Sequence, residues 1–290
     1  MRLAILGFGL IGGSVARALR AGETPRAEIV AWSPSGRGPR EAAAAGIVDR
    51  VARDAASAID RADVVLLAAP PLGCLALLDE LAGRLRPALG AALVTDVAST
   101  KAAIVARAAS HGLRFVGGHP MAGRETSGYA AADPDLFADR PWVVVPGDAA
   151  PGDVEAVEAL VRSCRARPMR MAAGAHDDAV AAISHLPLVI AAALVEAVAG
   201  TPDAPREDWT ATAALAATGW RDATRLARGD VEMGAGIAAT NAVALARRAR
   251  DLRAALDAWL ADLERAGGPD PERLEARLDA ARAMLERDTG

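Results

Sequence analysis

Three glycines near the start of the chain have the spacing of a phosphate-binding turn. Gly7, Gly9 and Gly12 form a G-x-G-x-x-G pattern directly after an apolar run and at the start of a helical pattern. Such a turn uses glycine for its tight bend, for close approach of the backbone to a pyrophosphate and for packing of helix on strand. The helix N-terminus offers free N–H groups to the phosphates. The pattern predicts a dinucleotide site that also includes Leu10 and Ile11; the alternative is a plain glycine-rich turn.

The end of the second apolar run bears on the choice of dinucleotide. About twenty residues past the glycines, NAD-binding chains place an acidic residue on the ribose 2′-hydroxyl. Here Ser33 follows the run, with Arg37 and Arg40 close behind. A carboxylate would repel a 2′-phosphate, whereas a hydroxyl and a guanidinium can bind one. Ser33 and Arg37 therefore favour NADP, and NAD is the alternative if this segment is only a solvated loop.

A histidine follows another predicted strand in the glycine-rich segment 117–123, GGHPMAG. The loops after the strands of an open α/β sheet are where ligands bind, and the near-neutral intrinsic pKa of an imidazole suits a proton acceptor. His119 is thus a candidate general base. Taken without its context, a histidine in such a loop is more often an ordinary turn residue.

Two residues after other predicted strands complete the predicted cofactor cleft. Pro70 follows the run 64–68 and is expected to line the cleft, unless it only forms the loop. Asp96 opens the segment 96–101, DVASTK. Its carboxylate is expected either to orient the loop that carries Ser99 or to cap the helix that follows.

The elements that must position these residues alternate between short apolar runs and amphipathic stretches. Predicted strands cover 3–6, 29–32, 64–68, 93–95, 115–116 and 142–145, and predicted helices between them cover 11–21, 72–85 and 101–109. Alternation of this kind favours an α/β fold with a Rossmann-type doubly wound, mostly parallel sheet.

After residue 172 the strand pattern gives way to helices. The stretches 175–199, 241–265 and 271–288 have helical periodicity, and the proline-containing stretches 200–206 and 267–271 are predicted loops. We therefore predict a dinucleotide-binding domain over 1–172 and an all-helical domain for substrate binding and dimerisation over 173–290.

Composition excludes several other classes of protein. The formal charge of −4 and the lack of a basic run argue against nucleic acid as a partner. Cys74 and Cys164 stand far apart, so neither a disulfide framework nor a cysteine-rich metal site is expected. We see no signal peptide and no uncharged run of about twenty apolar residues, so the sequence predicts a cytoplasmic protein without a membrane partner.

Four segments together resemble prephenate and arogenate dehydrogenases. They are 96–101, 117–123, 183–187 and 219–225, and the first two are the discriminating ones. The resemblance extends in order over most of the chain. It implies an oxidoreductase of L-tyrosine biosynthesis that oxidatively decarboxylates prephenate to 4-hydroxyphenylpyruvate, arogenate to tyrosine, or both, with hydride transfer to NAD(P).

The resemblance also implies roles for four side chains. His119 matches the catalytic base that takes the proton of the substrate's hydroxyl, and Ser99 matches the residue that holds this imidazole in register. Arg221 matches the arginine that pairs with the ring carboxylate, although a helix-surface arginine is the alternative. His185 is expected near the substrate, and a packed structural histidine is an equal alternative.

The remaining histidine positions separate this chain from part of the family. His111 and His176 are interpreted as structural or exposed. Many members that use prephenate have a second histidine where this chain has Leu188. Together with Ser33 and Arg37, this change shifts the expectation towards arogenate, or use of both substrates, with NADP.

Two other functions remain as alternatives. A two-domain hydroxyacid dehydrogenase or related reductase would place a catalytic lysine on the helical domain, but the chain's only lysine is Lys101. A non-catalytic dinucleotide sensor would not need His119, Ser99 and Arg221.

The long Ala- and Leu-rich helices have more apolar face than a small domain can bury. This excess predicts a homodimer, and the resemblance implies the same assembly.

Overall fold

The computed structural model describes residues 1–22, 27–124 and 126–287. By their internal contacts the residues form two compact units, 1–245 and 246–290. The first unit contains the α/β part and a set of helices, and the second contains most of a helical hairpin. Asp288, at the end of the predicted tail helix, lies outside the described residues.

One sheet organises the first unit, and within the described residues it has eight strands in the order β3-β2-β1-β4-β5-β6-β7-β8. Only the β6–β7 pair is antiparallel. The predicted doubly wound, mostly parallel sheet is confirmed. The strands are β1 (Arg2–Leu6), β2 (Glu28–Trp32), β3 (Arg50–Val51), β4 (Val64–Leu67), β5 (Leu93–Asp96), β6 (Phe115–Pro120), β7 (Pro141–Val145) and β8 (Arg167–Arg170).

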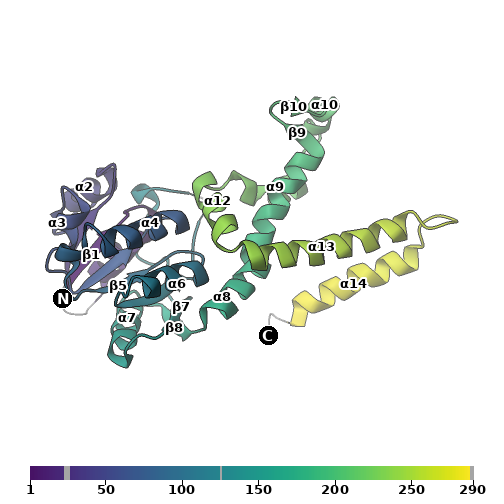
Figure 1. Ribbon diagram of the computed structural model, residues 1–290. Helices are drawn as coiled ribbons and strands as arrows, with labels where there is room; N and C mark the ends of the chain where they lie inside the picture. Colours follow the sequence, from purple (N-terminus) through teal and green to yellow (C-terminus); the bar gives the residue numbers. More distant parts are fainter. Residues whose placement is uncertain (23–26, 125, 288–290) are drawn as a thin grey trace. The chain divides into compact units, whose positions relative to one another are not determined.

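Helices cover both faces of this sheet (Figure 1). Successive residues of a strand point to opposite faces, so Leu3 and Ile5 of β1 lie in one apolar cluster and Ala4 and Leu6 lie in the other. Helices α1, α2 and α7 pack on the first face, and α3 to α6 pack on the second. Their bounds are α1 (Leu10–Ala21), α2 (Arg37–Ala44), α3 (Ala55–Ile59), α4 (Pro71–Ala82), α5 (Arg86–Leu89), α6 (Ala102–Ser110) and α7 (Pro151–Ser163).

The structure differs from the predicted elements at several places. Strands β3 and β8 were not predicted, because β3 has two residues and β8 reads Arg-Pro-Met-Arg, without an apolar run. The predicted helix 72–85 ends at Ala82 and is followed by the short α5. The predicted loop 200–206 contains a two-residue antiparallel pair, β9 (Gly200–Thr201) and β10 (Ala204–Pro205).

The rest of the first unit is built around one long helical stretch. Helix α8 (Ala173–Val180) continues through a π-helical turn (Ala181–His185) into α9 (Leu186–Ala199). Helix α12 packs on α4 of the α/β part, where Gly236 approaches Pro71. The other elements are α10 (Trp209–Ala213), α11 (Thr218–Ala223), a 3-10 turn (Arg225–Arg228) and α12 (Val231–Thr240).

The stretch Ala173–Ala199 has the length and hydropathy of a membrane span, and 22% of its most apolar window is buried. The stretch contains Asp177, Asp178 and Glu196, so it is not an uncharged run of the kind whose absence was expected from the sequence. Length and composition alone are weak evidence for a span, and buried hydrogen bonds of Asp177 and His185 tie this stretch to other elements of the first unit. Its exposed apolar side chains include Ile183, Val189 and Ile190.

The second unit contains two helices in an antiparallel hairpin, α13 (Ala242–Leu263), which begins in the first unit, and α14 (Pro271–Arg287). The carboxylate of Asp262 on α13 accepts hydrogen bonds from Arg273 and Arg277 of α14. The guanidinium of Arg277 also lies 4.2 Å from the centre of the Trp259 ring. These polar contacts join the two helices, and no residue of α14 is buried.

Candidate active site

Two of the three glycines after β1 are required by the turn that they form. Gly7 has φ +92°, and a Cβ atom there would lie 2.3 Å from the carbonyl oxygen of Ala68. A Cβ on Gly12 would lie 2.7 Å from the carbonyl oxygen of Gly7. At Gly9, by contrast, a Cβ would meet no described protein atom within 4 Å. The first and third glycines therefore serve the fold, and the second leaves open space at the N-terminus of α1.

This turn lies where the strand order reverses, between the carboxyl ends of β1 and β4. Ligands of open α/β sheets bind at such a switch point. Pro70 directly precedes α4 on the same edge and is half-buried. Leu10 and Ile11 pack partly against the core from the first turn of α1. The residues predicted to hold a pyrophosphate thus share one edge of the sheet.

The predicted ribose-binding residues follow β2. Ser33 is half-buried, and its carbonyl oxygen accepts the N–H of Gly36 in a turn that leads into α2. Arg37 is exposed and pairs with Glu41 one helical turn later, with 2.9 Å between Nε and Oε1. Neither residue is committed to the core, so both are available to a ligand.

A buried ion pair fixes the strand that carries the candidate base. Lys101 and Asp96 have no exposed surface and form an ion pair with each other. Asp96 also accepts the backbone N–H of Gly118 at 3.0 Å, and the Lys101 ammonium donates to the carbonyl oxygen of Gly118 at 2.7 Å. Both backbone groups of Gly118, the residue before His119, are therefore held by charged groups.

The structure decides between the two interpretations of Asp96. Its carboxylate accepts the N–H of Ala98 at 3.0 Å and so orients the loop that leads to Ser99. It does not cap α6, because the carboxylate of Asp177 accepts the N–H groups of Lys101 and Ala102 at 2.7 and 2.8 Å. Its contact with the cofactor stays a prediction.

His119 lies within β6, not in a loop after it as predicted from the sequence, and it is half-buried. Its Nδ1 atom is 2.8 Å from Nε2 of His176, and the two rings meet edge to face with 5.0 Å between their centres. Burial lowers the pKa of His119 well below its usual value, and the nearby His176, Lys101 and His185 lower it further. His119 is therefore neutral at physiological pH, as a proton acceptor must be.

His176 is the functional candidate that the sequence interpretation missed. It is 1% exposed, and its Nδ1 atom lies 2.8 Å from Oδ1 of Asp177. The interpretation of His176 as structural or exposed overlooked this link between the candidate base and a carboxylate. The adjacent His-Asp pair was visible in the sequence, but its contact with a residue in β6 was not.

Asp177 and His185 connect this cluster to the later helices. The amide nitrogen of Asn241 donates to the carbonyl oxygen of Asp177 at 2.8 Å and lies 3.1 Å from Nδ1 of His185. His185 is 1% exposed, and its Nε2 atom has no partner among the described residues. Burial lowers the pKa of His185 to about 4, with Asp177 opposing the shift and His176 adding to it.

Two predicted residues stand apart from this cluster. Ser99 is half-buried, and in the part of the chain that the structure describes its hydroxyl makes no hydrogen bond to His119. Arg221 is exposed on α11, and its guanidinium has no hydrogen bond or ion pair within the described ranges. The two residues directly before Arg221, Gly219 and Trp220, line a shallow groove of about 380 Å³.

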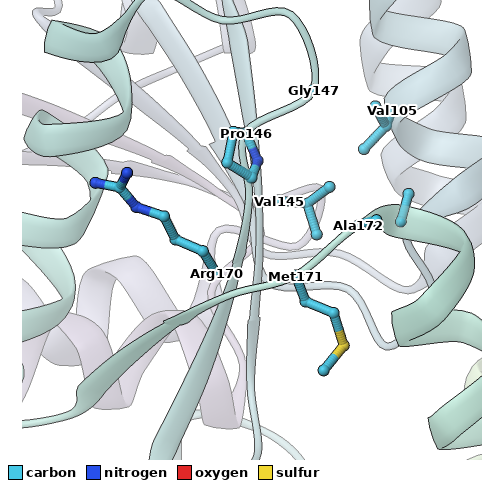
Figure 2. Close-up of a pocket in the computed structure, with 8 residues that line it drawn as sticks. Val105, Val145, Pro146, Gly147, Arg170, Met171 and Ala172 are labelled. Atoms are coloured by element: carbon cyan, nitrogen blue, oxygen red, sulfur yellow. The ribbon is translucent and has the colours of Figure 1, made fainter.

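A second hollow, of about 470 Å³, contains none of the predicted site residues (Figure 2). It lies where β7 and β8 end and α8 begins, and Val105 of α6 closes one side. Arg170 at its edge is already paired with Glu158. Over the described residues, no group of three or more histidine, cysteine or acidic side chains is arranged to hold a metal ion.

Two family models match the chain. The model of the prephenate dehydrogenase nucleotide-binding domain matches residues 15–170, and that of the prephenate dehydrogenase dimerization domain matches residues 172–274. Together they span most of the sequence.

Individual relatives agree with the family models. A prephenate dehydrogenase of Bacillus subtilis is 34% identical over 77% of this chain and 59% of that protein, so the chain spans less than two thirds of its length. A cyclohexadienyl dehydrogenase of Zymomonas mobilis is 32% identical over 91% of this chain and 86% of that protein. The crystal structure of Synechocystis arogenate dehydrogenase superposes with a TM-score of 0.77 at 31% identity, covering 98% of this chain and all of that one. The chain belongs to the prephenate dehydrogenase family.

Proposed function

We propose that this chain is an NAD(P)-dependent dehydrogenase of L-tyrosine biosynthesis that oxidatively decarboxylates prephenate, arogenate or both. The observation that carries the proposal is a neutral, half-buried imidazole, His119, at the sheet edge that also carries an open glycine turn. Membership of the prephenate dehydrogenase family supports the same activity.

The residues of the turn fit a dinucleotide. Gly9 leaves space where a pyrophosphate would approach the N-terminus of α1, while Gly7 and Gly12 are closed against the protein. A bound nicotinamide would supply the acceptor for the substrate's hydride. Leu10, Ile11, Pro70 and Asp96 belong to the same proposed cofactor site.

The chain's own side chains would handle the proton and the carboxylate. His119 accepts the proton of the substrate's hydroxyl, which breaks the O–H bond. The hydride leaves from the carbon that carries this hydroxyl. Arg221 pairs with the ring carboxylate until it departs as carbon dioxide. Ser99 orients the hydroxyl. His185, which belongs to the cluster around His119, contacts the substrate's side chain. The substrate-binding role is assigned to residues 173–290, and the cofactor-binding role to residues 1–172.

The choice of cofactor and substrate follows from three positions. Ser33 and the exposed guanidinium of Arg37 favour NADP over NAD, since no carboxylate at the end of β2 would repel a 2′-phosphate. Leu188 stands where many family members that use prephenate have a histidine. This difference favours arogenate, or both substrates, over prephenate alone.

A turnover assay with both substrates and both cofactors tests the function directly. We expect the absorbance of reduced nicotinamide to rise with prephenate or arogenate, and fastest with NADP. Binding of NADP without its reduction by either substrate would disprove the activity and leave a dinucleotide sensor.

A pair of glycine variants tests the cofactor site separately. Gly9→Ala should leave the thermal midpoint unchanged, because its Cβ meets no described protein atom, but it should weaken NADP binding by at least tenfold. Gly152→Ala, on α7 and equally open, is the matched control and should change neither. Unchanged affinity in Gly9→Ala would place the cofactor elsewhere.

The chain is further proposed to act as a cytoplasmic homodimer joined through its helical part. The exposed apolar side chains of α9 and the description of the matching family model support this assembly. Ile190→Asp should convert a dimer to a monomer in light scattering, while Met169→Asp, at an exposed site on β8, should not. A wild-type monomer would disprove it.

A further inference from the structure

Three side chains form a hydrogen-bonded chain that ends at the candidate base. Oδ1 of Asp177 is 2.8 Å from Nδ1 of His176, and Nε2 of His176 is 2.8 Å from Nδ1 of His119. His176 and Asp177 are 1% and 3% exposed, so water does not compete for these bonds. Neither residue has a role in the function proposed above.

The direction of each bond follows from the chemistry of its ends. Hydrogen bonds from His176 and from the backbone N–H groups of Ala102 and Lys101 outweigh burial and lower the pKa of Asp177, so its carboxylate is ionised and can only accept. Nδ1 of His176 must therefore donate. In a neutral imidazole the other nitrogen, Nε2, then accepts, and the partner that donates to it is Nδ1 of His119. The proton of His119 is thus on Nδ1, and Nε2 carries a lone pair.

We propose that His176, anchored by Asp177, is a positioning residue that holds His119 in the tautomer whose Nε2 atom accepts a proton. The proposal rests on the proposed function for the identity of the proton donor, the substrate's hydroxyl. In a free imidazole either nitrogen can carry the proton, and the tautomer with the proton on Nε2 cannot act as a base at that atom.

The same chain of bonds stabilises the product of the proton transfer. Once Nε2 has taken the proton, the positive ring donates through Nδ1 to His176, which in turn donates to the carboxylate of Asp177. The other charged or titratable groups around His119 are Lys101, already paired with Asp96, and His185, whose Nδ1 lies 3.1 Å from the amide of Asn241. Asp177 is therefore the carboxylate in this cluster that is linked to His119 by hydrogen bonds.

The position of His176 is fixed by more than its own bonds. Because Asp177 also accepts the first N–H groups of α6, the N-terminus of α6 and helix α8 are held at one carboxylate. His176 lies on α8, and His119 lies on β6, where Asp96 and Lys101 hold the N–H and the carbonyl oxygen of Gly118. Lys101 links the two elements that carry the imidazoles, because its backbone N–H binds Asp177 and its ammonium binds the carbonyl oxygen of Gly118.

The tautomer can be measured without any substrate. The chain has four histidines, so long-range ¹⁵N–¹H correlation spectra can be assigned by comparison with His119→Asn and His176→Leu. We expect His119 to be neutral with its proton on Nδ1 at neutral pH, and to lose this pattern in His176→Leu. A proton on Nε2 of wild-type His119, or an imidazolium at His176, would overturn the proposal.

Kinetics provide the second test, with a conservative variant as rescue. His176→Leu removes the acceptor and should lower kcat on the order of 100-fold while KM and the Kd for NADP stay within about threefold, since only the proton transfer is affected. His176→Gln carries an amide oxygen that can accept from Nδ1 of His119 and should recover most of kcat. His111→Gln, a surface histidine hydrogen-bonded to Asp79, is the matched control and should keep full activity.

The outcomes separate this proposal from the proposed function. If wild-type His119 shows the expected tautomer but neither prephenate nor arogenate is oxidised, the positioning role stands and the substrate assignment fails. If both substrates react equally well in wild type and His176→Leu, the function stands and the positioning role is overturned. Equal loss of kcat in the Leu and Gln variants would also overturn it, because a packing defect and not the acceptor would then be responsible.

Discussion

The two side chains proposed to touch the substrate, His119 and Arg221, lie in very different surroundings. His119 is held by a second imidazole, and a buried ion pair holds both backbone groups of the preceding Gly118. Arg221 is exposed on a six-residue helix, and its guanidinium has no partner among the described residues. The candidate base has its supporting contacts within one chain, whereas none of the described residues fixes the guanidinium.

This contrast follows from what each group must do. A base needs a defined tautomer and a low pKa, which burial and neighbouring hydrogen bonds provide in advance. An arginine that binds a carboxylate needs free N–H groups, so a protein partner would compete with the ligand. The comparison predicts that substitutions at His119 act on turnover and that those at Arg221 act on affinity.

The largest effect is expected from His119→Asn. Loss of the proton acceptor should lower kcat by roughly 10³-fold, as for other general bases, while the Kd for NADP stays nearly unchanged. Single-turnover kinetics and cofactor titration measure the two quantities. A parallel loss of both would show that His119 supports the fold and not the chemistry, and the contrast with Arg221 would disappear.

Arg221→Ala should act in the opposite way. Removing a charge-assisted pair costs about 3 kcal/mol, so the apparent KM for prephenate or arogenate should rise roughly 100-fold. Arg228→Ala, another exposed arginine on the following 3-10 turn, is the matched control and should behave as wild type. Equal KM values in the two variants would assign Arg221 to the solvated surface.

Acid should weaken the protein through its buried imidazoles. His185 has a pKa of about 4 in the folded chain and 6.5 as its ordinary value. Between these values the unfolded chain binds more protons, so stability falls as the pH falls from 6.5 towards 4, by up to roughly 3 kcal/mol from this residue. His185→Gln should make that fall shallower in denaturant unfolding, while above pH 6.5 the pH dependence should match wild type. The same slope in both proteins would mean that His185 is not buried as a neutral ring.

The smallest effect is expected at Ser33, the residue predicted to lie beside the cofactor's ribose. Ser33→Asp adds a carboxylate at the end of β2 and should shift the ratio of kcat/KM for NADP to that for NAD by about tenfold towards NAD. The turnover number with saturating NAD should remain close to wild type, because His119 is far along the chain and belongs to another strand. An unaltered ratio would remove the basis for preferring NADP.

Much of the α/β part could be predicted because local sequence determines it. Runs such as 64–67 are apolar on both faces, as a buried parallel strand requires, and the glycine pattern allows only one turn between β1 and α1. Strand β8 could not be predicted, because its two arginines and its proline do not form an apolar run, and its position is set by pairing with β7.

The sequence proposed individual residues for the candidate site but not the hydrogen-bond network around them. The sequence interpretation identified His119 as a base and gave it the Ser99 hydroxyl as its support. The structure gives it His176, which is 57 residues away in sequence, as its hydrogen-bond partner. Asp177 was missed for the same reason: its acceptor role for the N–H groups of Lys101 and Ala102 depends on how α8 packs on α6. Contacts of this kind are set by tertiary packing and leave no periodic pattern.

The burial of Lys101 has a practical consequence for chemical labelling. It is the only lysine in the sequence, and no part of its side chain reaches the surface. Reagents that acylate amines should therefore leave every side chain of the native protein unmodified and should react at Lys101 only after the α/β part opens. A single mass increment at this one position would then report unfolding, with no engineered probe.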